Sequence, residues 1–228
     1  MSSATSSWLA SAVAVFAKDW RCELRSRYAL HAIALFAVTT LVVASSSLGP
    51  LGADKSQAVT VLPALLWLIL LFAAAAGLPR AFVHEEEAHT SAALRLAAPP
   101  SALFAGKLAY GASLLLGLEA LIAPLYLALM SLDVPSPGLF AATLLAGGYG
   151  LAAGSSLIAA LASQARGRST LFSVLAFPVL LPLLLLAIEL TRNAVAGQPA
   201  GVALPQLLLY DASVTVAGLM LFPFVWNP

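Results

Sequence analysis

The chain has 228 residues, of which 61% are hydrophobic and 9% are charged, and its formal net charge is +1. A mean hydropathy of +0.96 means that the chain carries more apolar surface than a soluble domain of this length can bury, so the composition indicates a membrane protein. The chain also lacks the concentration of basic residues that is typical of a nucleic-acid binder. Its single cysteine, Cys22, excludes an intramolecular disulfide, a CxxC redox pair, a thiolate zinc site and CxxCH haem attachment.

The first predicted element is an amphipathic helix over residues 8–27. An apolar stripe recurs at every fourth position: Trp8, Ala12, Phe16, Trp20 and Leu24. Lys18, Arg21 and Arg25 share another face, as is typical of a helix that lies flat in the membrane interface. A soluble amphipathic helix is the weaker alternative, because an apolar stretch follows at once. No basic residue precedes Lys18, so a cleavable signal peptide is not expected.

Six further stretches are apolar enough to cross a bilayer, which takes about 20 residues as a helix. They cover residues 28–47, 59–78, 103–130, 138–163, 171–190 and 204–226. Turn-forming sequences rich in Gly, Pro and polar residues separate them. We expect no soluble domain, so the sequence predicts a single all-α transmembrane domain over residues 1–228.

Basic residues predict the orientation, because short loops rich in Lys and Arg stay in the cytoplasm. Most of the 11 basic residues fall on one side: Lys18, Arg21, Arg25, Arg27, Arg80, Arg95, Lys107, Arg166 and Arg168. Only Lys55 and Arg192 fall on the other side, where Asp54, Asp133 and Glu189 are also expected. Both termini are therefore predicted to be cytoplasmic.

The loop between the second and third spans contains HEEEAH at residues 84–89. A zincin helix needs HExxH, in which two ligands four residues apart share one face and the Glu acts as general base. Here His84 and His89 are separated by about 140° around a helix, so they cannot hold one ion without distortion. We therefore expect no metal site.

The alternative for this loop is a short, acid-rich cytoplasmic helix over residues 80–96. It is expected to end before Pro99 and Pro100, with Ser101 as the N-cap of the third span. A helix carried directly on two spans can pass force from a soluble partner into the membrane. The phosphate-binding motif GxxxxGK[ST] is absent, so if ATP is used at all, we expect another chain to bind it.

Five stretches, in their order and spacing, resemble the haem exporter protein B (CcmB) family, the membrane subunit of the ABC transporter of cytochrome c maturation. They are KDWRCELRSRYAL at 18–30, GLPRAFVHEEEAHT at 77–90, the segment 99–107 that leads into LEALIAPLYLAL, FPVLLPLLLLAIELTRNAVAG at 177–197 and LLLYDASVTVAGLMLFPFV at 207–225. The resemblance covers nearly the whole chain.

This resemblance implies a type 2 ABC exporter fold: an interfacial N-terminal helix, six spans, and a coupling helix between spans two and three. It also implies a homodimer in the bacterial inner membrane that pairs with two copies of a separate ATPase subunit. A haem-handling membrane protein and a small single-span subunit complete the assembly, which releases haem-loaded chaperone on the outer side. The chain is then a transport subunit and not an enzyme, and its ATPase-docking residues are Arg80, His84, Glu85, Glu86, Glu87 and Thr90.

Haem is expected as a possible cargo and not as a bound cofactor. Axial ligation needs a histidine or similar donor near the outer face, whereas His31, His84 and His89 map to the cytoplasmic side. An exporter of another amphipathic cargo, such as a lipid, drug or polysaccharide, would have the same fold, and this alternative stays open.

Glu119 lies midway along the third predicted span, Asp211 lies in the sixth, and Glu189 lies near the outer rim of the fifth. A carboxylate at the depth of Glu119 costs on the order of 3 kcal/mol. Glu119 therefore lines a subunit interface or substrate path, or is a protonated acid bonded to a neighbouring helix, and the same alternatives apply to Asp211. Glu189 is expected to be solvated. An intramembrane enzyme that uses Glu119 and Asp211 is a third hypothesis, but a paired-carboxylate motif, a nucleophile with its base and a metal cluster are all missing.

Two patterns bear on helix packing. Pro178 and Pro182 predict a kinked or broken fifth span, which would serve as a hinge for export or as a packing adjustment. The fourth span carries a small-residue face that permits close helix contact, within the chain or between copies. Its glycines are Gly147, Gly148, Gly150 and Gly154.

Overall fold

The computed structural model describes residues 2–48, 55–78, 98–163 and 168–226, and every regular element in these ranges is an α-helix. The helices are α1 (Ser2–Ser26), α2 (Tyr28–Leu48), α3 (Lys55–Gly77), α6 (Pro100–Met130), α7 (Pro137–Ser163), α8 (Arg168–Ala196) and α9 (Ala203–Trp226). Six of them, α2 to α9, are long and apolar enough to cross a membrane. The prediction of an all-helical membrane protein with six spans is therefore confirmed.

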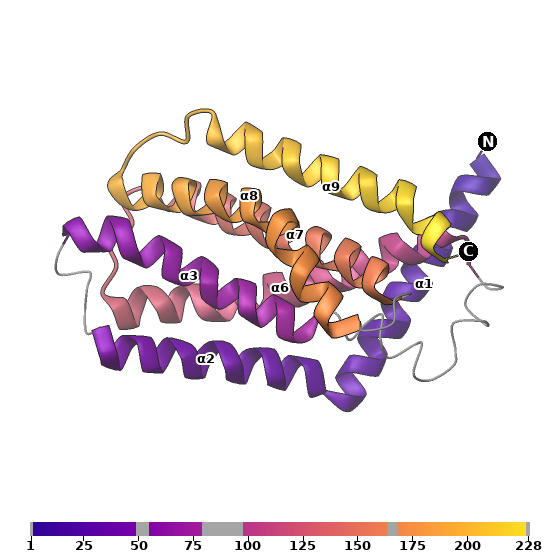
Figure 1. The fold of residues 1–228 in the computed structure, drawn as a ribbon, viewed down its shortest axis with the longest axis horizontal. Coiled ribbons are helices and arrows are strands. Elements are labelled where there is room, and N and C mark those ends of the chain that lie inside the picture. The colour runs from indigo at the N-terminus through magenta and orange to yellow at the C-terminus, as the bar shows by residue number, and fades with distance from the viewer. Residues whose placement is uncertain (1, 49–54, 79–97, 164–167, 227–228) are drawn as a thin grey trace.

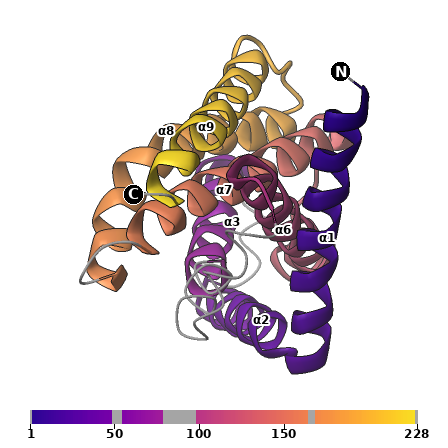
Figure 2. The same cartoon turned by 90° about the vertical axis from the view of Figure 1, so that its right-hand side faces the viewer.

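The six spanning helices run side by side, and α1 crosses one end of them (Figures 1 and 2). We call this end, where α3 ends at Gly77 and α6 begins at Pro100, the α1 end of the bundle. Both chain termini lie at the α1 end (Figure 1). The segment between α3 and α6 therefore joins two spans at the same end of the bundle as α1.

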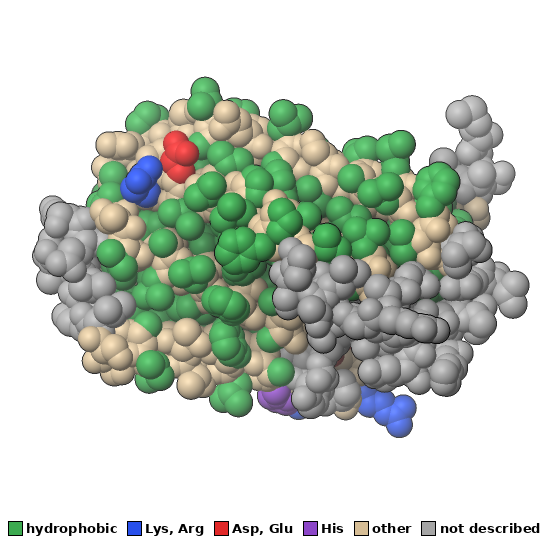
Figure 3. Space-filling view, in the orientation of Figure 1, with side chains coloured by type: hydrophobic (Ala, Val, Ile, Leu, Met, Phe, Trp, Pro, Cys, Tyr) green, Lys and Arg blue, Asp and Glu red, His purple; other side chains and the backbone are tan. Residues whose placement is uncertain are grey.

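The helix α7 lies at the centre of the bundle and packs against α3, α6, α8 and α9. Every residue from 151 to 160 is buried. The outer helices instead expose large apolar side chains, among them Leu35 on α2, Phe177 on α8 and Phe224 on α9. Figure 3 shows hydrophobic side chains over most of the described part of one face, with the few charged ones away from its centre. Such a surface suits contact with lipid chains.

Helix α6 begins differently from the prediction. Ser101 was expected as its N-cap, but this prediction is wrong: the N-cap is Pro99, without a side-chain cap, and Pro100 occupies the first helical turn. Proline is favoured at this position because its fixed φ suits the helix and its missing N–H needs no partner there. Ser101 Oγ instead accepts a hydrogen bond of 2.9 Å from Trp8 Nε1 of α1.

Helix α8 continues through Pro178 and Pro182, so the alternative of a broken fifth span is wrong. Its ribbon changes direction along its length (Figure 1). Each proline lacks a backbone donor, which disturbs the hydrogen bonding of the preceding turn. Between the two prolines, the carbonyl of Val179 accepts a hydrogen bond from Tyr210 Oη of α9. A neighbouring helix thus supplies a donor at the disturbed turn, and a hinge role stays a prediction.

The predicted end of the fifth span at residue 190 is too early, because α8 runs to Ala196. Its added turn is tied to α3 by a buried bond of 2.8 Å from Trp67 Nε1 to Thr191 Oγ1. The hydroxyl of Thr191 in turn donates to the carbonyl of Ala187 at 2.8 Å. The polar residues that seemed to end the span therefore extend the helix and connect it to its neighbour.

Replacing Thr191 with valine should lower the free energy of unfolding by about 1 kcal/mol, because the buried indole N–H loses its acceptor while the side-chain volume is kept. Chemical denaturation of the purified chain in detergent measures the change. The double variant Thr191→Val, Trp67→Phe should lose less free energy of unfolding than the sum of the losses in the two single variants, since both substitutions remove the same hydrogen bond. Strict additivity would contradict this role.

Candidate functional site

The predicted ATPase-docking residues lie outside the described residues. They are Arg80, His84, Glu85, Glu86, Glu87 and Thr90. The structure does place the helices that carry them, since α3 ends at Gly77 and α6 begins at Pro100. Among the described residues, α1 and the first turns of α6 form this end of the bundle together with the end of α3.

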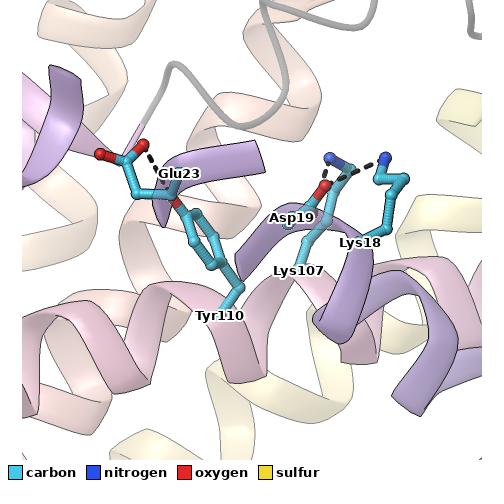
Figure 4. Close-up of polar contacts among 5 residues, drawn as sticks. All are labelled: Lys18, Asp19, Glu23, Lys107 and Tyr110. Carbon is cyan, nitrogen blue, oxygen red and sulfur yellow. Dashed lines mark hydrogen bonds and ion pairs between the residues drawn. The ribbon is translucent and has the colours of Figure 1, made fainter. Parts of the chain in front are cut away.

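A polar cluster fastens α1 to the first turns of α6 (Figure 4). We call Asp19, Glu23, Lys107 and Tyr110 the α1–α6 clamp. Its ion pair joins Lys107 Nζ to Asp19 Oδ2 at 3.4 Å, with the two side chains 0% and 10% exposed. Asp19 Oδ1 also lies 3.0 Å from Lys18 Nζ. Because an isolated buried charge is very costly, a fully buried ammonium makes the position of Asp19 important for stability.

The second acid of the clamp, Glu23, holds the corner between α1 and α2. Its Oε2 accepts a hydrogen bond of 3.3 Å from Tyr110 Oη, and its Oε1 accepts one of 2.8 Å from the backbone N–H of Leu30. Leu30 lies in the first turn of α2, where backbone N–H groups have no helical acceptor. Arg27, with φ of 53°, makes the turn between the helices. One carboxylate therefore connects α1, α2 and α6.

Sequence reasoning missed the clamp. It treated Lys107 only as a positive charge of the inner side, although the residue lies inside the predicted third span. One available signal was the pair Asp19 and Glu23, four residues apart on the helix face that also holds Val15. Acids on the inward face of an interfacial helix require partners, and the buried lysine of a neighbouring span is a suitable one.

Four of the glycines of α7 provide space for side chains from four helices. Trp67 of α3 lies against Gly147, Glu119 of α6 against Gly148, Asp211 of α9 and Leu183 of α8 against Gly150, and Leu180 of α8 against Gly154. A Cβ atom at any of these positions would overlap the neighbouring side chain. The small-residue face predicted for the fourth span therefore makes its close contacts within the chain.

The two intramembrane acids, Glu119 and Asp211, are both buried and lie against α7. Their contacts, Gly148 and Gly150, are about 200° apart around the helix, so the acids approach α7 from different sides. The structure therefore does not join them into one carboxylate pair. Glu119 Oε2 and Asp211 Oδ1 have no hydrogen-bond partner among the described residues, which is unusual for buried polar atoms.

The remaining candidates are exposed. Glu189 is exposed on α8, and His31 is exposed in the first turn of α2 at the α1 end. In the described ranges, no three His, Cys, Asp or Glu side chains gather as a metal ion would require. The buried acidic and basic side chains of the described helices thus belong to the α1–α6 clamp, as Glu23 and Lys107 do, or lie beside α7, as Glu119 and Asp211 do.

Comparison with known proteins gives two matches that agree with each other. The family described as CcmB protein matches residues 10–227 of the chain. The heme exporter protein B of Bradyrhizobium diazoefficiens is 28% identical over 212 residues, which cover 92% of this chain and 93% of that protein. The family match takes in all six spans and most of α1.

Proposed function

The chain belongs to the CcmB family, and from this premise we propose that it is the membrane subunit of an ATP-driven transporter that serves haem export in c-type cytochrome biogenesis. The observation that carries this proposal is the family match over residues 10–227, the whole membrane bundle. A relative aligned over 93% of its own length bears the name heme exporter protein B. The sequence resemblance to this family is thereby confirmed.

The proposed transporter takes its energy from a separate ATPase subunit, because this chain has no phosphate-binding motif. Its segment between Gly77 and Pro100 is carried directly by two spans, which supports a coupling role. We place the α1 end on the cytoplasmic side of a bacterial inner membrane, because Lys18, Arg21 and Arg25 lie on α1. Two copies of the chain, two ATPase subunits, a haem-handling membrane protein and a small single-span subunit complete the proposed assembly, which has the type 2 ABC exporter fold.

Haem is proposed as the cargo of the assembly and not as a cofactor held by this chain. His31 is exposed at the α1 end, away from the outer face where haem would be delivered. Export of haem, or release of haem-loaded chaperone, then depends on motions of the bundle that ATP hydrolysis drives. Glu119 and Asp211 are proposed as polar groups of the path or interface that changes during these motions.

Deletion of the gene tests the proposal. We expect the deletion strain to lose c-type cytochromes, detected by the peroxidase activity of covalently bound haem on denaturing gels, and this chain alone to restore them. Normal cytochromes together with loss of an exported lipid, drug or polysaccharide would instead establish the alternative cargo.

Reversing the charge of Glu85, Glu86 and Glu87 to lysine should abolish docking of the ATPase, because like charges across an interface cost several kcal/mol. We expect co-purified ATPase and mature c-type cytochrome to fall about tenfold or more, with insertion of the chain unchanged. Glu189→Lys, an exposed acid on α8, is the matched control and should have no effect. Unchanged cytochrome maturation in the triple variant would contradict the docking role.

A further inference from the structure

Helix α1 separates its charged residues by face. Its two acids, Asp19 and Glu23, turn inward. Asp19 accepts a hydrogen bond from Lys107, and Glu23 accepts hydrogen bonds from Tyr110 and from the first turn of α2. Arg21 and Arg25 are exposed, and neither forms an ion pair with an acid in the described part of the chain. Because the acids of the clamp already bind partners within the protein, no acid of the described helices pairs with the arginines on the outward face of α1.

An apolar strip lies beside these arginines on the same helix. Leu9, Val13 and Leu24 are exposed by 57%, 62% and 50% of their surface. At about 100° per residue they fall within about 60° of one another, and Arg21 and Arg25 follow on the next part of the helix surface. An apolar strip flanked by cations is the pattern of a helix that lies in the boundary between lipid headgroups and acyl chains.

The position of α1 in the fold agrees with this pattern. The helix crosses the end of the spanning bundle (Figures 1 and 2). Only Arg27 separates it from the spanning helix α2, and the α1–α6 clamp holds it against α6. No linker separates α1 from the spanning helix α2, so its apolar strip and its arginines stay next to the end of the membrane-spanning bundle.

We infer that Arg21 and Arg25 form a binding surface for the phosphate groups of anionic phospholipids in the leaflet that α1 enters. A guanidinium donates two parallel hydrogen bonds to a phosphate and is weakly hydrated, which suits an interfacial site. The adjoining apolar strip favours a lipid over a free phosphate ion, because the acyl chains of a lipid also cover Leu9, Val13 and Leu24. The direct connection of α1 to the spanning helix α2 favours a lipid over a soluble acidic protein. This surface depends on the geometry of α1 and does not require the proposed transport function.

The chain contains a built-in probe for this surface. Cys22 is its single cysteine, is exposed, and follows Arg21 directly. An environment-sensitive fluorophore on Cys22 of the full chain, reconstituted in phosphatidylcholine nanodiscs, should respond as phosphatidylglycerol is added. The double variant Arg21→Gln, Arg25→Gln should need an about tenfold or higher phosphatidylglycerol fraction, given the contribution of each basic residue at a membrane surface. Arg192→Gln, an exposed arginine on α8, is the matched control.

The response should weaken when salt is raised from about 0.05 M to about 0.5 M, because the attraction is screened. Equal responses of the wild-type chain and the double variant would overturn the inference. A full response to inorganic phosphate in phosphatidylcholine nanodiscs would also overturn it and identify a free-phosphate site. A response that appears only when the ATPase subunit is added would show that the surface binds protein instead.

Discussion

Gly147→Ala should destabilise the bundle by about 3 kcal/mol, at the upper end of the cost of overpacking a well-packed core. A Cβ atom at this position would lie 2.7 Å from Cζ3 and 2.9 Å from Cζ2 of Trp67. The indole is rigid, fully buried and held by its bond to Thr191, so it cannot move aside. The helices α3 and α7 must therefore separate, which disturbs the centre of the bundle.

Gly148→Ala should cost less, although its Cβ atom would lie 2.6 Å from Cδ of Glu119. The reason is that a carboxyl group ends a flexible chain and can rotate, whereas the indole ring cannot. Gly117→Ala is the matched control: it lies in α6, nothing lies within 4 Å of its Cβ position, and replacing glycine in a helix interior should stabilise the fold by about 0.5–1 kcal/mol.

Chemical denaturation in detergent measures the free energy of unfolding of these three variants and so ranks them by stability. Adding Trp67→Phe to Gly147→Ala should recover part of the lost stability, because the smaller ring withdraws the atoms that overlap. If Gly147→Ala were no more harmful than Gly117→Ala, the close approach of α3 and α7 would be incorrect.

The sequence predicts the spans well because one physical requirement dominates them. A helix in hydrocarbon must satisfy its own backbone hydrogen bonds and present apolar side chains, and both conditions are visible in a single stretch. The small-residue face of α7 can also be predicted from the sequence, because its glycines lie in one continuous stretch. Its partners cannot, because Trp67 and Asp211 reach α7 from helices whose positions depend on the whole fold.

Long-range polar contacts and chain ends follow other rules. Asp19 and Lys107 are 88 residues apart, and no local pattern indicates that they meet. At Ser101 a local rule gave the wrong result, because the N-cap preference for serine competes with the preference of proline for the first helical turn, and here proline prevails. The docking role of residues 80–96 stays a prediction, since these residues lie outside the described ranges, whereas the flanking helices α3 and α6 lie within them.

Asp19→Asn should destabilise the fold by about 3 kcal/mol or more, because it removes a negative charge 3.4 Å from an ammonium group that is fully buried. Lys107→Met should cost much less, since methionine fills a similar volume without a charge and Asp19 keeps its contact with Lys18 at 3.0 Å. Lys18→Gln is the control near the same acid, and because the Lys18 side chain is 39% exposed, the loss should be at most about 1 kcal/mol.

The decisive variant combines the two clamp substitutions. Asp19→Asn together with Lys107→Met removes both charges, so it should be more stable than Asp19→Asn alone, although it carries one more substitution. The free energy of unfolding in detergent measures this order. A double variant less stable than Asp19→Asn would contradict charge burial as the reason that the clamp holds. In that case the packing of the lysine stem, and not the burial of its charge, would fix α1 against the helix that follows the proposed coupling segment.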